Sequence, residues 1–211
     1  SYKSNSRGSM ITWITEKWSS ASRIYEIKIE DIIGKNPGDN RKLQALLEEL
    51  NVLRGIHAVK TAIEKLIEMA KHNYALEKKH QKPLPIALNK LFVGKPGTGK
   101  TTVAKIYGNI LRELKLLSNG EVLERSSSNF IGAYTGQSQA NTSAIISAAD
   151  GKVLLIDEAY VLAETDYGLR ALDTIVELIQ AKPGADIAVI MIGYKDEMLT
   201  MCRDVNPGLA R

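Results

Sequence analysis

Apolar side chains between residues 41 and 80 recur at the spacing of two amphipathic helices. Four leucines between residues 43 and 50 mark the first helix, for which Asp39 or Asn40 is the expected N-cap. A second apolar face runs from Val59 to Tyr74, and two prolines beyond it, at 83 and 85, stop the helix because proline lacks the backbone N–H that a helix interior needs.

Beyond residue 86 the pattern changes to strands that alternate with helices. Short apolar runs predict strands at 88–93, 121–124, 152–156 and 187–192, and helical spacing predicts helices at 100–115, 138–149, 168–180 and 195–202. The last two strands are almost wholly apolar, as expected when helices cover both faces of a sheet. The fold class predicted is therefore α/β, with a central parallel sheet flanked by helices.

The same pattern divides the chain into three parts. Residues 1–40 form a partly irregular leader, and its first ten residues are either natural sequence or the remnant of a tag. Residues 41–85 form an N-terminal helical segment, and residues 86–211 form the α/β core.

Composition narrows the classes of partner and compartment. The formal net charge is +4, but lysines lie among glutamates rather than in one run, so nucleic acid is not an expected partner. A single cysteine, Cys202, excludes an internal disulfide and fits a reducing compartment. No apolar run is long enough to span a membrane. We expect a soluble, intracellular protein, with the cytoplasm favoured and a nucleus or organelle left open.

The strongest chemical signal is a glycine-rich stretch between the first core strand and its helix. It matches G-x-x-x-x-G-K-[ST] at every fixed position and reads Gly94-Lys95-Pro96-Gly97-Thr98-Gly99-Lys100-Thr101. Glycines let backbone N–H groups converge on an anion, Lys100 would bridge the outer phosphates, and the Thr101 hydroxyl would hold Mg²⁺. The stretch predicts a binding site for a nucleoside triphosphate with Mg²⁺.

A second signal is the pair of carboxylates that follows the apolar run Val153–Ile156. Asp157 and Glu158 come at the carboxyl end of a predicted strand, which is the edge where open parallel sheets bind ligands. Asp157 would hold Mg²⁺ through water, and Glu158 would orient or deprotonate the water that attacks the γ-phosphorus. With the phosphate loop, this pair predicts hydrolysis.

These motifs resemble those of the AAA+ ATPases, and within them the CbbX/CfxQ group of red-type Rubisco activase and stage V sporulation protein K relatives. The resemblance extends from about residue 43 to the end, and its motifs lie at 53–60, 92–104, 155–160, 166–168, 192–196 and 206–208. It implies a P-loop NTPase fold of the AAA+ large-subdomain type, with ATP and Mg²⁺ as cofactors and Thr102 among the nucleotide-binding residues. It also implies a ring, as a hexamer of the full-length protein, that remodels a protein substrate.

The resemblance assigns further roles outside the phosphate loop. Gly55 and Ile56 are implied to line the adenine pocket. The segment Ala133-Tyr134-Thr135 corresponds to a pore loop, in which Tyr134 would grip the substrate polypeptide while glycines at 132 and 136 permit hinge motion. The alternative is that Tyr134 packs at the base of a loop.

Two departures from the family pattern leave alternatives open. The residue that senses the γ-phosphate is often Asn, Ser or Thr, whereas here either Tyr194 or Lys195 would have that role. Arg211 is either the arginine finger that completes a neighbouring site or an arginine at the chain end with no role. We also expect the small helical lid domain to be missing. The two functions that remain are an ATP-driven remodelling module and an ATP-controlled interaction domain with little turnover.

Overall fold

The computed structural model describes residues 36–37, 40–94, 97–134, 136–181 and 185–205, all within the compact unit that begins at Asn36. The leader predicted at 1–40 lies almost entirely outside these residues. In chain order, the elements are α3 (Arg41–Val52), α4 (His57–Lys78), β1 (Lys90–Val93), α5 (Lys100–Glu113), β2 (Val122–Ser126), η1 (Ser127–Asn129), α6 (Gln137–Ala148), β3 (Val153–Asp157), η2 (Ala159–Ala163), α7 (Asp166–Ala181), β4 (Ala188–Gly193), α8 (Lys195–Thr200) and η3 (Met201–Val205). In the described part of the chain, no helix combines the length and apolar character needed to cross a bilayer.

The four strands of the described residues form one parallel sheet in the order β1-β4-β3-β2. Val93 pairs with Gly193, and Ser126 pairs with Asp157, so the carboxyl ends of all four strands lie at one edge. This arrangement confirms the predicted α/β class, and ligands of open parallel sheets bind beyond that edge.

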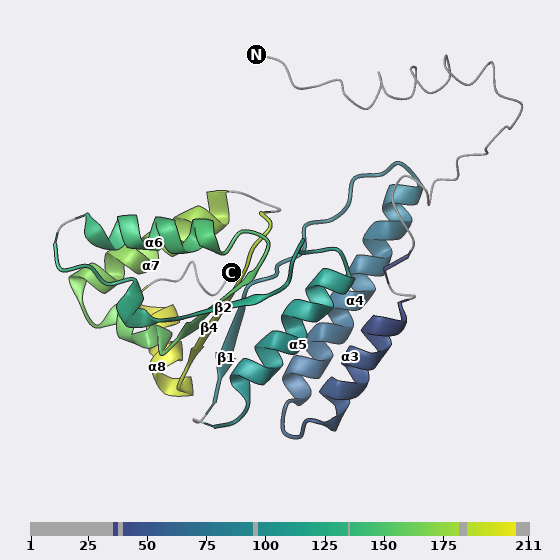
Figure 1. Ribbon diagram of the computed structural model, residues 1–211, viewed down its shortest axis with the longest axis horizontal. Coiled ribbons are helices and arrows are strands. Elements are labelled where there is room, and N and C mark those ends of the chain that lie inside the picture. Colours follow the sequence, from purple (N-terminus) through teal and green to yellow (C-terminus); the bar gives the residue numbers. More distant parts are fainter. Residues whose placement is uncertain (1–35, 38–39, 95–96, 135, 182–184, 206–211) are drawn as a thin grey trace, which may run out of the picture. The chain divides into compact units, whose positions relative to one another are not determined.

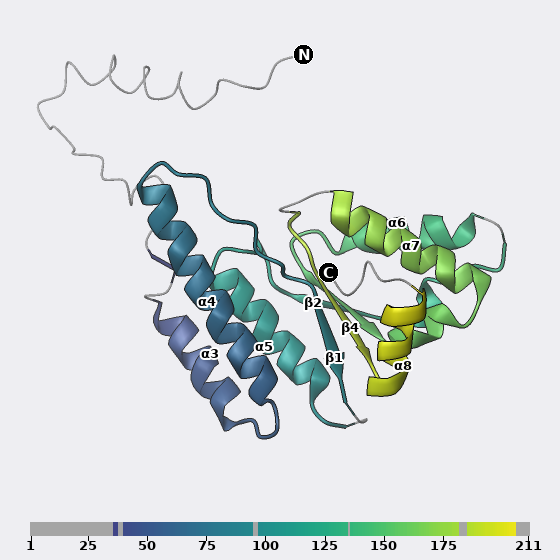
Figure 2. The same cartoon turned by 180° about the vertical axis from the view of Figure 1, so that it is seen from behind.

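Helices cover the two faces of the sheet in separate groups, with α3, α4 and α5 on one face and α6, α7 and α8 on the other (Figures 1 and 2). Alternate strand residues supply the two cores because successive side chains of a strand point to opposite faces. Leu155 and Ile190 pack in the core with α3–α5, whereas Leu154 and Met191 pack in the core with α7 and α8. Each fully buried Leu or Ile contributes roughly 2 kcal/mol of transfer free energy, so the two cores stabilise the sheet from both faces.

The two N-terminal helices belong to the first of these cores. Asn40 caps α3, because its Oδ1 accepts a hydrogen bond from the backbone N–H of Lys42 at 2.9 Å. Its Nδ2 donates to Glu113 Oε2 at the end of α5, which ties the start of α3 to the helix that follows the glycine-rich stretch. Asn40 is thus the N-cap, whereas Asp39 lies outside the described residues.

Strand β2 runs further than the apolar pattern predicted. Its last residues, Arg125 and Ser126, are polar, but they pair with Ile156 and Asp157 of β3. Backbone pairing with a buried neighbour extends the strand although the side chains give no apolar signal. The extension brings the chain after Ser126 level with the end of β3.

Candidate active site

A cavity of about 400 Å³ lies at the carboxyl edge of the sheet. Its walls come from the glycine-rich loop, the start of α5, and the residues that follow β3 and end β4. The lining residues are Gly94, Gly97, Gly99, Lys100, Thr101, Asp157, Glu158, Tyr160, Ile192, Gly193 and Tyr194. Two motifs more than fifty positions apart in the sequence therefore meet in one space.

The glycine-rich loop leaves open space where side chains would otherwise lie. Gly97 and Gly99 have φ of +73° and +78°, a left-handed conformation that glycine adopts without strain. A Cβ placed on either residue would meet no atom within 4 Å. Gly99 is also the N-cap of α5, whose first backbone N–H groups are unpaired within the helix and attract anions. The loop therefore has both the room and the donors for phosphate groups.

Lys100 and Thr101 form the first turn of α5 and line the cavity. The Lys100 ammonium group donates a hydrogen bond to the carbonyl oxygen of Gly94 at 3.0 Å, which folds the side chain back along the loop. The backbone N–H of Gly94 donates to the carbonyl oxygen of Gly193 at 3.2 Å, so the loop is also tied to the end of β4. These contacts place a cation beside the space that the glycines leave.

The two predicted carboxylates follow the buried part of β3, and both are exposed toward the cavity. Asp157 Oδ1 accepts a hydrogen bond from the backbone N–H of Glu158 at 3.0 Å. Glu158 itself adopts φ +51° and ψ +42°, a left-handed conformation that costs a residue with a Cβ about 1 kcal/mol or more. The turn ends the alternation of the strand, which would send consecutive side chains to opposite faces, and both residues line the same cavity.

Ser127 supports the turn from the neighbouring strand. It lies directly after β2, is almost fully buried, and its hydroxyl lies 3.0 Å from the carbonyl oxygen of Asp157 and 2.7 Å from that of Glu158. The hydroxyl has one proton, which these two acceptors share. Sequence reasoning missed Ser127, because one serine in the run 126–128 looks like any other until the register of β2 and β3 is known.

Tyr160 also lines the cavity and was not predicted as a site residue. Its ring lies 5.7 Å from the ring of Tyr194, centroid to centroid, with a tilt of 37°. Burial raises the pKa of the Tyr160 phenol, and the carboxylates of Glu158 and Glu197 raise it further. The phenol therefore stays protonated at neutral pH. The only sequence signal was its position two residues after Glu158.

The residues present fit a nucleotide with a divalent metal ion. The cavity combines helix-end N–H donors and the Lys100 ammonium for phosphates with hydroxyl and carboxylate oxygens, from Thr101 and Asp157, of the kind that Mg²⁺ prefers. Tyr194 and Lys195 were the two alternatives for the residue that senses the γ-phosphate. Tyr194 lines the cavity, and Lys195 is not among the lining residues.

Other predicted site residues lie elsewhere. Gly55 and Ile56 precede α4, and neither lines the cavity; Ile56 packs against the core formed with α3–α5. Thr98 and Thr102 are exposed and are not among the lining residues either. Lys95, Pro96, Thr135, Arg211 and the 206–208 motif fall outside the described residues. Their assigned roles stay predictions.

Tyr134 is 75% exposed, on a loop that packs closely at its base. The backbone N–H of Ala133 donates to Gln137 Oε1 at 2.8 Å, and that of Gly132 donates to the Ser138 hydroxyl at 2.9 Å. A Cβ on Gly132 would lie 2.5 Å from Gln137 Cβ, so this glycine permits close packing. In this conformation Gly132 is therefore a close-packed position, and the hinge motion expected from the sequence stays a prediction.

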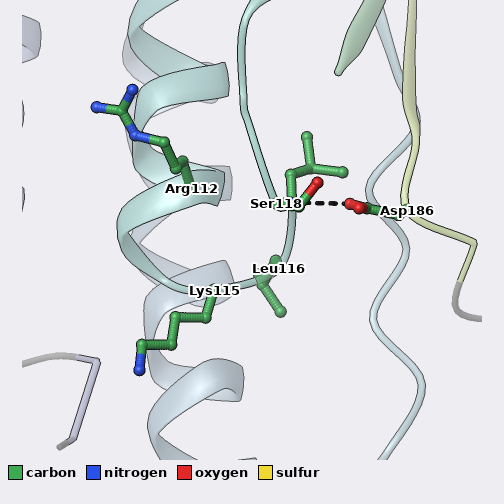
Figure 3. Close-up of a pocket in the computed structure, with 6 residues that line it drawn as sticks. Arg112, Lys115, Leu116, Ser118 and Asp186 are labelled. Carbon is green, nitrogen blue, oxygen red and sulfur yellow. Dashed lines mark hydrogen bonds between the residues drawn. The ribbon is translucent and has the colours of Figure 1, made fainter. Parts of the chain in front are cut away.

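A second cavity of about 400 Å³ lies at the other end of α5. Its lining includes Arg112 and Lys115, whose charged groups point away from the hydrogen bond that the Ser118 backbone N–H donates to Asp186 (Figure 3). The cationic and acidic groups do not converge on one point. This cavity therefore offers no arrangement comparable with the site at the carboxyl edge.

Comparisons with known proteins agree with this geometry. A model of the ATPase family associated with various cellular activities (AAA) matches residues 90–201. Over 187 residues the chain is 33% identical to stage V sporulation protein K of Bacillus subtilis, covering 87% of this chain and 58% of that protein. It is 33% identical over 174 residues to the chloroplastic ribulose bisphosphate carboxylase/oxygenase activase of Cyanidioschyzon merolae, covering 80% and 59%.

A protein CfxQ homolog of Pyropia yezoensis is similar to the same degree, with 34% identity over 177 residues that cover 82% of this chain and 58% of the homolog. The chain thus spans less than two thirds of the length of these relatives. The matched family segment starts at β1 and ends just after α8, so it contains every residue that lines the cavity at the carboxyl edge.

Proposed function

This chain belongs to the AAA family of ATPases, and within it to the CbbX/CfxQ group, and on that premise we propose that it binds ATP with Mg²⁺ and hydrolyses it in the cavity at the carboxyl edge of the sheet. The observation that carries the proposal is that Lys100, Thr101 and the Asp157–Glu158 pair line one cavity. Phosphoryl transfer needs groups that position phosphate, metal and water together, and little covalent chemistry from the protein.

Binding follows from the loop and the start of α5. The triphosphate lies against Gly97 and Gly99, where no side chain fills the space, and Lys100 leaves its intramolecular acceptor, the Gly94 carbonyl oxygen, to neutralise the outer phosphates. Thr101 and Asp157 hold Mg²⁺, which when bound draws charge from the phosphate oxygens and fixes their orientation.

Glu158 is the proposed general base. Its carboxylate orients a water molecule and accepts its proton as the water oxygen forms a bond to the γ-phosphorus. The bond from the γ-phosphorus to the bridging oxygen breaks, leaving ADP and inorganic phosphate. The left-handed backbone at Glu158 supports this role, because strained conformations recur at functional sites where the surrounding structure holds them.

For the full-length protein we propose a ring, as a hexamer, that uses this hydrolysis to remodel a protein substrate. The high exposure of Tyr134 supports contact with a polypeptide, since an exposed aromatic ring offers apolar contact that does not depend on sequence. Gly55 and Ile56 at the adenine and Arg211 as the finger of a neighbouring subunit complete the proposed site.

Three variants test the proposal. Glu158→Gln is expected to retain ATP and to lose turnover, because the amide still fits the site but cannot accept the proton; Lys100→Ala is expected to lose ATP binding. Glu177→Gln, an exposed carboxylate of α7 outside the cavity, is the matched control and should behave as the parent. Calorimetric ATP binding and phosphate release are measured with and without Mg²⁺.

Turnover that rises cooperatively with protein concentration would support a ring-forming motor. ATP binding without turnover at any concentration would favour the alternative of an ATP-controlled interaction domain. Hydrolysis by Glu158→Gln at the parental rate would show that Glu158 is not the base.

A further inference from the structure

Tyr160 and Tyr194 form an aromatic pair, and both residues line the cavity at the carboxyl edge. Tyr160 lies in η2, two residues beyond Glu158, and Tyr194 follows β4. Their centroid separation of 5.7 Å lies in the range in which aromatic rings attract each other, by about 0.5–1.5 kcal/mol beyond the area that they bury. Tyr194 is 38% exposed, so the Tyr160 ring packs against a side chain that is partly open to solvent.

Tyr160 also packs on the backbone that carries Tyr194. A Cβ built on Gly193 would lie 2.9 Å from Tyr160 Cδ1 and 2.7 Å from Met198 Cγ, distances that real Cβ atoms do not show. The Tyr160 ring and the Met198 side chain therefore share the space beside Gly193, and a side chain at that position would force one or both to shift. Ring and backbone contacts together restrain the orientation of Tyr194 relative to the phosphate loop, which is bonded to the same Gly193 through Gly94.

The surroundings of Tyr160 favour packing over direct chemistry. Burial raises the pKa of its phenol, and the carboxylates of Glu158, Glu197 and Glu164 raise it further, so the group stays neutral and adds no charge beside them.

We propose that Tyr160 is a positioning residue that holds Tyr194 against the terminal phosphate of bound ATP, and so lets the site distinguish ATP from ADP. This inference rests on the proposed function, because it concerns the same cavity. Tyr194 donates its hydroxyl to a γ-phosphate oxygen, a hydrogen bond that ADP cannot receive. Tyr160 lines the same cavity, but its proposed part in the ATP-to-ADP preference is to hold the Tyr194 ring, so it acts through Tyr194.

The test measures Kd for ATP and for ADP, with Mg²⁺, in the full chain that also carries Glu158→Gln to prevent hydrolysis. Tyr194→Phe should weaken ATP relative to ADP by about tenfold, the usual effect of losing one hydrogen bond to a charged group. Tyr160→Leu should lower the ATP-to-ADP preference to the same extent, and Tyr160→Phe should leave it unchanged because the ring remains. The double variant Tyr160→Leu/Tyr194→Phe should be no worse than either single variant.

Tyr167→Leu, an aromatic loss on α7 outside the cavity, is the matched control, and thermal unfolding shows that each variant is folded. Tyr160→Met provides a second route if the leucine variant does not fold, because it also removes the ring and should also lower the preference. An unchanged preference in both Tyr160→Leu and Tyr160→Met, or a loss in Tyr160→Phe equal to that in Tyr160→Leu, overturns the inference while the proposed function stands. Absence of binding of either nucleotide overturns the proposed function and this inference with it.

Discussion

The Ser127 hydroxyl lies 2.7 Å from the carbonyl oxygen of Glu158, the residue whose backbone is left-handed at the end of β3. The contact joins the ends of two neighbouring strands, β2 and β3, at a position thirty-one residues apart in the chain. It holds the peptide that directs the Glu158 carboxylate, which makes Ser127 a support of the proposed general base.

Ser127→Ala should therefore lower turnover more than it lowers ATP affinity. The change leaves the Asp157 and Glu158 carbonyl oxygens without this partner, with an expected loss of about 1–3 kcal/mol in the free energy of unfolding. Ser128→Ala is the matched control, because Ser128 is exposed and its hydroxyl lies 2.7 Å from the Ser126 hydroxyl. Urea unfolding and kcat measured on both variants decide the point, and equal effects in the two would refute the role of Ser127.

Gly99→Ala should abolish most nucleotide binding at a modest cost in stability. Alanine in the left-handed conformation costs about 1–2 kcal/mol, and its Cβ would stand in the open space of the loop. Gly136→Ala is a close control, since Gly136 is also a left-handed N-cap, at φ +83°, with no atom within 4 Å of a built Cβ. Both variants should lose similar stability, but only Gly99→Ala should lose ATP affinity by calorimetry. Similar ATP affinity in the two would mean that phosphate does not lie against Gly99.

Gln137→Ala should loosen the Tyr134 loop without unfolding the domain. The variant loses the acceptor of the Ala133 N–H at the exposed end of the loop, a net contribution of about 0.5–1.5 kcal/mol. Amide hydrogen exchange at 132–134 should accelerate, whereas exchange in β3 should not. Ser143→Ala, at an exposed polar residue further along α6, is the control. Protection at 132–134 that matches the parent would show that Gln137 does not order the loop.

Tyr107→Phe should change the pH dependence of stability above pH 10. The Tyr107 hydroxyl is buried in α5 and donates to the Leu88 carbonyl oxygen at 2.9 Å, and burial raises the pKa of the phenol well above its usual value. The folded state therefore keeps the proton that the unfolded state loses, so this phenol's contribution is complete below pH 10 and falls as pH rises.

At pH 7 the phenylalanine variant should be about 0.5–1.5 kcal/mol less stable than the parent. The difference should shrink and then reverse as pH passes from 10 to 11, measured by urea unfolding. A difference that stays constant over that range would contradict the assignment. Tyr74→Phe, at a less buried tyrosine of α4, is the variant with which the stability of Tyr107→Phe is compared.

The local motifs were predictable because their chemistry depends on residues that are consecutive in the chain. The phosphate loop from Gly94 to Thr101 combines residue types that have one common use in that order. The pair Asp157–Glu158 gains its meaning from following that loop in the same α/β core. The strands at β3 and β4 were predictable for a different reason, since a buried parallel strand requires an unbroken apolar run. The polar end of β2 carried no such run and was missed.

By itself, then, the sequence determined the α/β class, the phosphate loop, the carboxylate pair and the order of elements, because these depend on neighbours in the chain. Only the tertiary structure decided that Ser127 supports the Glu158 turn, that Tyr160 packs on Gly193 and Tyr194, and that Gln137 ties down the Tyr134 loop. Those contacts depend on the register of parallel strands and on the way the chain turns after them. Residues far apart in sequence, or of an unremarkable type, acquire their partners only when packing of the two cores fixes the sheet edge at which they meet.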